Sequence, residues 1–456
     1  MKLVYDVKDK PGFGKTLVFA LQQLLAIMAA TIAVPMIISR SYDSVGDVSM
    51  STAAALFGAG VGTLVYLLFT KFRSPVFLGS SFAFLGSMSA AFAGAASMQA
   101  GYLGLIIGAV LAGLVYVVIA LLVKIAGVGW IDKLMPAVVI GPTVAIIGLS
   151  LSGNAVGDLV KGSVLNAEGV PVANTYIALF CGLVTLAVTM LCSTYGKKMI
   201  KMIPFIIGIV AGYAVAAIFT VIGKAAGVEA LQVINFSAFE NMKWLPDFTF
   251  LEAFKGVKDI SGGYIATLAV AYVPVAFVVF AEHIADHKNI SSIIEKDLLK
   301  EPGLHRTLLG DGVGSMLGAF FGGCPNTTYG ESVGCVAISG NASVVTILTT
   351  AILAIVIAFI APFIAFLSTI PSCVMGGVCI ALYGFIAVSG LKMIQNVDLG
   401  DNRNLFVVSV ILIAGVGGLT LNFGKVTLTQ VACALILGIL TNLILKKRAG
   451  KKSSDK

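Results

Sequence analysis

The chain is dominated by long runs of apolar residues that are separated by short polar segments. Two of the clearest runs are 103–123 and 344–367. About 20 apolar residues are enough to cross the hydrocarbon core of a bilayer as a helix. One such run could be a buried helix of a soluble protein, but a long series of them could not. The pattern therefore predicts an all-α polytopic membrane protein.

Counting these runs and the breaks between them predicts fourteen membrane spans. Three of the spans, near Val76, Arg306 and Thr328, are short and are interrupted by glycine, serine or a charge. A count by hydropathy alone would therefore return twelve to fourteen. The predicted spans begin near Lys15, Ser51, Val76, Gly101, Leu134, Asn174, Ile203, Gly263, Arg306, Thr328, Val344, Ile370, Asn404 and Val426.

The composition agrees with this pattern, because 58% of the residues are hydrophobic and only 11% are charged. A soluble domain needs roughly 25% charged residues to cover its surface. The start of the chain has neither the apolar core nor the cleavage site of a secretory signal. The sequence also lacks a nucleotide-binding loop, metal-ligand spacing and a nucleophile–base pair. We therefore expect neither an ATP-driven pump nor an enzyme, and neither a metal nor an organic cofactor.

The basic residues predict how the spans are oriented. If both termini are cytoplasmic, 23 of the 30 Lys and Arg lie on the inner side, including the cluster in the tail 446–456. A bias of this size favours an even number of spans with both ends inside. The expected location is the inner (cytoplasmic) membrane. The net charge of +8 then reflects topology and anionic headgroups rather than nucleic acid binding.

The order of the spans predicts an inverted repeat. The hydrophilic stretch 224–262 separates seven spans from seven. Because seven is odd, two such units insert with opposite topology, as in many secondary transporters. A sequence echo supports the repeat: spans five and twelve open with Pro136-Ala-Val-Val-Ile-Gly141 and Pro371-Ser-Cys-Val-Met-Gly376.

Spans three and ten are the unusual members of the two halves. They read VFLGSSFAFLGSMSAA (76–91) and TTYGESVGCVAISG (327–340), with glycine, serine and β-formers where a membrane helix would have leucine. Paired interrupted spans are a good sequence indicator of a transporter's binding site. Non-helical backbone at membrane depth has to line a cavity or be enclosed by protein. The alternative is a pair of tightly packed helices rich in small residues.

Four acidic residues lie in or next to spans, namely Glu282, Asp286, Asp311 and Glu331. An ionisable group inside a span is costly and normally faces a cavity. Glu331 lies within interrupted span ten, so we expect it to bind a ligand, which is compatible with capping a half-helix. Asp311, in Gly310-Asp-Gly-Val-Gly314, is expected to cap or hydrogen-bond a helix start.

The position of Glu282 depends on where span eight ends. Hydropathy favours an interfacial position, and Asn289 is expected to cap a separate interfacial helix after the span. If the helix continues past Asp286, however, Glu282 and Asp286 share one face at i, i+4 spacing. Two neighbouring carboxylates raise each other's proton affinity, as a proton-coupled carrier requires.

These residues suit a flat, neutral ligand. Carboxylates accept hydrogen bonds, and the free N–H groups of a broken span donate them. Together they match the alternating N–H and C=O groups of a pyrimidine or oxopurine. Phe82 and Tyr329 could supply an aromatic wall, and the motif Gly79-Ser-Ser81-Phe82 offers backbone groups. An anion would require Arg or Lys, and none lies inside a span.

At these residues the chain resembles the nucleobase–ascorbate transporters (nucleobase:cation symporter-2), and within them the bacterial uracil permease branch. The resemblance runs from about Gly14 to Lys446. It is carried by GSSFAF (79–84), AEH (281–283), KDLLKEPGLHR (296–306), PNTTYGESVG (325–334) and PSCVMGGV (371–378).

The resemblance implies a 7+7 inverted repeat with short strands in spans three and ten. It implies a core domain (14–125 and 263–366) and a gate domain (134–222 and 370–446), and a homodimer. It also implies proton-coupled import of uracil or a related nucleobase. It implies that the base is bound by Glu282, Glu331, backbone groups at Phe82 and Gly330, and Tyr383. The residues themselves add the expectation that Ser81 and Tyr329 also bind the base and that Glu282 and Asp286 take part in proton coupling.

Three departures from the family pattern affect these expectations. The uracil branch tends to have His at Asp286, many members have Gln-His at Gln22-Gln23, and Ser332 replaces the usual Asn. A xanthine or other purine permease of the same family remains an alternative. A membrane sensor or channel that binds a base without concentrating it is the alternative from another class.

Overall fold

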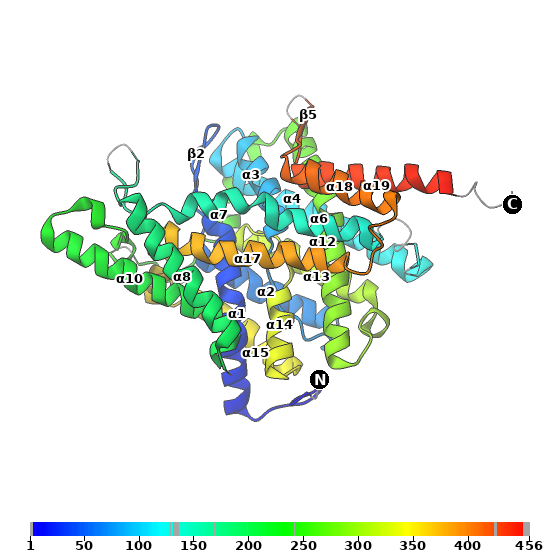
Figure 1. Ribbon diagram of the computed structural model, residues 1–456, viewed down its shortest axis with the longest axis horizontal. Coiled ribbons are helices and arrows are strands. Elements are labelled where there is room, and N and C mark those ends of the chain that lie inside the picture. The colour runs from blue at the N-terminus through cyan, green and yellow to red at the C-terminus, as the bar shows by residue number, and fades with distance from the viewer. Residues whose placement is uncertain are drawn as a thin grey trace.

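Helices form most of the protein in a computed structural model that describes residues 3–127, 129–130, 136–166, 169–197, 199–240, 242–423 and 426–449. Figure 1 shows α8 and α10 at one end of the long axis and α18 and α19 at the other. The longer helices are α1 (Phe13–Ile38), α2 (Thr52–Phe69), α4 (Met98–Ala126), α6 (Ala137–Ser150), α8 (Thr175–Tyr195), α10 (Pro204–Ala226), α12 (Gly262–Ile294), α13 (Leu304–Gly322), α15 (Val344–Ile357), α17 (Ser372–Met393), α18 (Asn402–Val416) and α19 (Gln430–Ala449).

Short elements connect these helices. The short helices are α3 (Leu85–Ala93), α7 (Ser152–Leu159), α9 (Met199–Met202), α11 (Thr249–Ala253), α14 (Gly330–Ser339), α16 (Ala361–Ser368), η1 (Phe82–Phe84), η2 (Glu229–Leu231), η3 (Ser237–Phe239), η4 (Phe254–Asp259) and η5 (Leu299–Gly303). The strands form three antiparallel pairs: β1 (Ser41–Tyr42) with β2 (Gly46–Asp47), β3 (Leu78–Ser80) with β4 (Asn326–Thr328), and β5 (Leu421–Phe423) with β6 (Val426–Leu428).

The structure confirms a mostly helical protein with many apolar spans. Within the described residues, eight helices are long and apolar enough to cross a membrane, or nine if the bent pair α15–α16 is one span. The two helices of that pair are inclined by 84°. The other predicted spans coincide with shorter or less apolar helices, namely α3, α13, α14, α18 and α19. The predicted start of span five, Leu134, lies outside the described residues.

The helices pack in two groups. One contains α1, α2, α4, α12, α13 and α15, and the other contains α6, α7, α8, α10, α17, α18 and α19. Helices α8 and α10 expose many apolar side chains, including Phe180, Leu191 and Ile222. Exposed apolar side chains of this kind suit contact with lipid.

Helices α2 and α13 approach each other closely because glycines line their crossing. A Cβ on Gly62 would stand 2.8 Å from the carbonyl oxygen of Gly314, and one on Gly314 would stand 2.8 Å from that of Gly62. Gly58 faces Gly318 one turn away, so the two helices run antiparallel. Any side chain at these positions would separate the helices and displace the strands that follow them.

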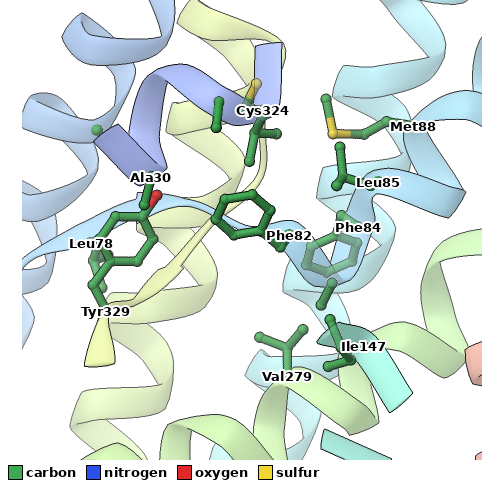
Figure 2. Packing of buried hydrophobic residues seen from close by; sticks show 14 of the residues in the cluster. Ala30, Leu78, Phe82, Phe84, Leu85, Met88, Ile147, Val279, Cys324 and Tyr329 are labelled. Carbon is green, nitrogen blue, oxygen red and sulfur yellow. The ribbon is translucent and has the colours of Figure 1, made fainter. Parts of the chain in front are cut away.

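The strands β3 and β4 lie in the segments that the sequence identifies as unusual. They pair in the register Leu78↔Thr328, Gly79↔Thr327 and Ser80↔Asn326, and all six residues are buried. Figure 2 shows Leu78, Phe82 and Phe84 along this part of the chain, with Tyr329 beside them. The enclosure satisfies backbone groups that lipid could not.

The first residues of the chain form a segment that we call the N-terminal arm (residues 3–9). Tyr5 forms a parallel bridge with Asn341, the N–H of Ala342 donates to Tyr5 O (2.9 Å), and the N–H of Val344 donates to Val7 O (3.1 Å). The ammonium of Lys296, just after α12, is paired with the Asp6 carboxylate. In Figure 1 the N-terminus lies near α14. The arm thus joins the ends of α12, α14 and α15.

Candidate functional site

Helix α12 carries two carboxylates toward a cavity. It runs unbroken from Gly262 to Ile294, so it continues past Asp286. The expectation that Asn289 caps a separate interfacial helix is therefore wrong, because Asn289 lies inside α12. Glu282 and Asp286, one turn apart on the same face, are both half-buried.

The third carboxylate lies at the start of the short helix α14. Gly330 is the first residue of α14 and Glu331 is in its first turn, directly after strand β4. The first turn of a helix leaves N–H groups without intrahelical partners and favours negative charge. This end of α14 can therefore both donate hydrogen bonds to a ligand and stabilise the Glu331 carboxylate.

Two small cavities meet at these acids. The smaller, about 30 Å³, is lined by Ser81, Phe82, Ala83, Ile147, Glu282, Thr327, Thr328, Tyr329, Gly330, Glu331 and Ile386. The larger, about 120 Å³, is lined by Val144, Glu282, Ala285, Asp286, Gly330, Glu331, Phe385, Ile386, Ser389 and Met393. Their shared residues bring α12 of the first helix group, together with α14, against α17 of the second group.

Asp286 is held by strand β4. The Thr328 hydroxyl donates to Asp286 Oδ2 (2.8 Å), and Oδ1 would stand 3.7 Å from a Cβ on Gly330. The i, i+4 spacing thus brings Asp286 to the same cavity as Glu282. Thr328 was not among the residues expected from the sequence. Its only signal was its place directly before Tyr329-Gly330-Glu331.

The aromatic residues contribute in different ways. Phe82 lines the smaller cavity and packs edge-on against Tyr383, with ring centroids 5.5 Å apart. Tyr329 also lines it, while its hydroxyl donates to the Ser80 carbonyl (2.7 Å). Tyr383 lines neither of the two cavities, although it is buried behind Phe82. It can therefore reach a ligand only through Phe82 in this conformation.

Apolar residues of α6 and α17 complete the site. Ile147 and Ile386 close the smaller cavity from the second helix group. Figure 2 shows Ile147 and Val279 below the Phe82 ring. Isoleucine in a membrane helix carries no functional signal, so sequence reasoning could not identify these contacts.

The site is acidic. The residues that line the two cavities include three carboxylates and no Lys or Arg. Within the described residues, no group of three or more His, Cys, Asp or Glu could hold a metal ion. The arrangement offers hydrogen-bond acceptors and helix N–H groups to a compact ligand.

The fourth membrane acid, Asp311, lies away from these cavities. It is in the middle of α13, so the expectation that it caps a helix start is wrong. Its Oδ2 accepts from His283 Nδ1 (2.6 Å), and His283 Nε2 lies 3.0 Å from the Thr307 hydroxyl. His283 follows Glu282 in sequence but points about 100° away around the axis of α12, where it links α12 to α13.

Comparison with known proteins places the chain among permeases. A model of the Permease family Xan_ur_permease matches residues 14–423. The chain is 39% identical to a uracil permease of Bacillus caldolyticus, over 98% of this chain and 96% of that protein. It is 35% identical to a uracil permease of Escherichia coli (strain K12), over 96% and 93%.

Solved structures share the fold at low sequence identity. The transmembrane domain of the cyanobacterial bicarbonate transporter BicA has a TM-score of 0.58 and 16% identity, covering 96% of this chain and all of that one. Murine Slc26a9, an anion transporter, has a TM-score of 0.62 and 12% identity, covering 97% of this chain and 69% of that one. The resemblance found in the sequence is thereby confirmed: this multi-pass membrane protein belongs to the Xan_ur_permease family of permeases.

Proposed function

We propose that the protein is a proton-coupled symporter that imports uracil or a closely related nucleobase. One observation carries the proposal: Glu282, Asp286 and Glu331 surround a cavity at the start of α14, and no basic residue lines it. Such a site accepts hydrogen bonds from a neutral solute and repels an anion. The names of the uracil permeases at 35 to 39% identity support the same substrate.

The chemistry of uracil suits this site. Its two N–H groups can donate to the carboxylates of Glu282 and Glu331, and its carbonyls can accept from the N–H groups at Phe82 and Gly330. Ser81 and Tyr329 border the same cavity, and Tyr383 supports the Phe82 ring. Residues of α12, α14 and α17 border these cavities, so a movement of α17 away from α12 and α14 would open the site to a base.

Proton coupling would use Glu282 and Asp286. Two carboxylates one turn apart in an enclosed site favour uptake of a proton. Coupling requires that the proton and the base stabilise the same conformation. Protonation that permits base binding from outside, followed by release of both inside, satisfies this condition without a cofactor.

We propose the finer architecture of the protein as well. The chain would form fourteen spans as a 7+7 inverted repeat, with β3 and β4 in spans three and ten. The core domain comprises 14–125 and 263–366, and the gate domain comprises 134–222 and 370–446. Both termini are cytoplasmic in the inner membrane, and the protein is a homodimer. Residues 134–135, 167–168, 198 and 424–425 of these segments lie outside the described residues.

Close helix contacts support the inverted repeat. A Cβ on Gly141 would meet the Gly390 carbonyl at 2.8 Å, and one on Gly376 would meet the Ala155 carbonyl at 2.9 Å. Each residue of one pair lies 235 positions from its counterpart in the other. Helices α6 and α17 also both begin directly after a proline, Pro136 and Pro371, in the same extended conformation.

Uptake of labelled uracil into proteoliposomes tests the function. We expect an inward proton gradient to drive uracil above its outside concentration, and a protonophore to abolish this accumulation. Glu331→Gln should remove uptake while the protein remains folded. Accumulation that ignores the protonophore would contradict coupling, strong competition by xanthine would favour a purine permease, and binding without accumulation would favour a sensor or channel.

A further inference from the structure

Ser332, the residue after Glu331, joins three elements next to the substrate site. It is fully buried in the first turn of α14. The amide Nε2 of Gln23, in α1, lies 2.5 Å from Ser332 Oγ and 3.3 Å from the Ser332 carbonyl oxygen. The N–H of Phe77, just before β3, donates to the same Oγ (3.1 Å). We call these three residues the serine junction.

The geometry defines the role of Gln23 as a donor. A main-chain carbonyl can only accept a hydrogen bond, so the Gln23 atom beside it has to be the amide nitrogen. That nitrogen carries two hydrogens and can serve both Ser332 oxygens. Gln23 is 3% exposed, which leaves no room for solvent to replace these bonds. A buried acceptor that loses its donor is costly.

The serine junction contacts two backbone segments of the site, namely the segment that leads to Phe82 and the start of α14. Phe77 begins the segment that leads through β3 to Phe82, and its carbonyl accepts from the N–H of Tyr329 (3.2 Å). Ser332 follows Glu331 directly, so a rotation of α14 moves the Glu331 carboxylate and the Gly330 N–H together. The junction therefore sets where the carboxylate stands relative to the backbone of Phe82.

We propose that Gln23 is a positioning residue of the substrate site, which acts through Ser332 to align Glu331 with the strand pair. Gln23 does not line the cavities and is not expected to touch the base. Its effect is therefore on affinity. Loss of one such hydrogen bond corresponds to a roughly three- to tenfold change in an equilibrium constant.

The test measures KM and Vmax for uracil in proteoliposomes containing the full chain, and it rests on the proposed function. Gln23→Met keeps the length of the side chain but removes both donors, so we expect a roughly three- to tenfold higher KM with a smaller change in Vmax. Gln23→His, which keeps an N–H donor, should retain more affinity than Gln23→Met. The shift in thermal stability caused by uracil reports binding without transport, and Gln23→Met should need more uracil for the same shift.

A double variant separates the junction from general damage. Because Ser332→Ala removes the shared acceptor, adding Gln23→Met should raise KM little further. Effects that multiply instead would overturn the proposal, as would an unchanged KM in Gln23→Met.

The matched control is Thr350→Val. The Thr350 hydroxyl donates to Ala20 O (3.3 Å), so it links the same helix α1 to α15 away from the cavities. We expect its KM to equal that of wild type, and a rise as large as that of Gln23→Met would mean that any loosening of α1 has this effect. If wild type itself transports no uracil, the proposed function fails, whereas transport with an unchanged KM in Gln23→Met refutes only the role of Gln23.

Discussion

The three carboxylates at the site have different surroundings. Glu331 stands at a helix start, where the dipole favours its charge. Asp286 accepts a hydrogen bond from Thr328 at 2.8 Å, and Glu282 borders both cavities. A group that exchanges protons needs a partner in one protonation state and space in the other. Asp286, which lines only the larger cavity, is the acid best separated from the groups that we propose to bind the base.

Replacing Asp286 should separate coupling from binding. In Asp286→Asn we expect uracil exchange across the membrane to continue while accumulation driven by a proton gradient falls at least tenfold, because the side chain can no longer exchange a proton. Thr328→Val, which removes only the hydrogen-bond donor, is the matched control and should keep accumulation. Equal loss of exchange and accumulation in Asp286→Asn would place this residue in substrate binding instead.

The limits of sequence reasoning are clear at individual residues. The acids and the motif at 327–340 could be identified, because a carboxylate in a span is rare enough to be informative. The contacts Thr328–Asp286 and Gln23–Ser332 could not, since they join residues 42 and 309 positions apart. Asn289 was misread because hydropathy cannot distinguish the end of a helix from the point where it leaves the membrane.

At the scale of the elements, the glycines of α2 and α13 allow these two helices to pack closely. Glycine in an apolar run was recognised as an interruption, but the sequence alone does not say which helix approaches it. The structure assigns Gly62 and Gly314 to one crossing, where backbone meets backbone. Small residues at such a crossing allow the close packing on which membrane helices depend.

An added methyl group at this crossing should destabilise the protein. A Cβ on Gly62 would stand 2.8 Å from a main-chain oxygen and 2.6 Å from the Asn326 amide, so Gly62→Ala forces a backbone shift. Overpacking of this kind costs about 1–3 kcal/mol, which should appear as a lower unfolding temperature in detergent. Gly157→Ala in α7 is the control, since nothing lies within 4 Å of its Cβ position. A Gly62→Ala variant as stable as that control would contradict the tight crossing.

At the scale of the whole molecule, the N-terminal arm holds together the ends of α12, α14 and α15, and α12 and α14 carry the acids of the site. The pairing of Lys296 with Asp6 lowers the pKa of that carboxyl from 3.8. A lowered pKa contributes stability above the unfolded value, and that stability is lost as the pH falls through the folded pKa. Both side chains are about half exposed, so the contribution is small.

The pH dependence of the arm's contribution to stability follows from the direction of the Asp6 pKa shift. Asp6→Asn should lower the unfolding temperature slightly near neutral pH, by the equivalent of less than about 1 kcal/mol. The difference from wild type should begin to shrink as the pH falls below 3.8 and should vanish only below the lowered pKa of Asp6. It should also shrink in high salt. Asp43→Asn serves as the control, because Asp43 forms no ion pair within the described residues. A difference that persists at low pH would show that the carboxyl acts through its hydrogen bonds rather than its charge.

The arm also has a consequence for biosynthesis. The first residues of the chain pair with residues 340–344, and β3 pairs with β4 nearly 250 positions later. About three quarters of the polypeptide must leave the ribosome before the arm or the strand pair can form. Until then the segment around Phe82 has unpaired backbone in or beside the membrane. Helices α1–α4 are therefore made before the partners of the arm and of β3 exist. A membrane insertion machinery that protects incompletely folded segments would act on α1–α4 in particular.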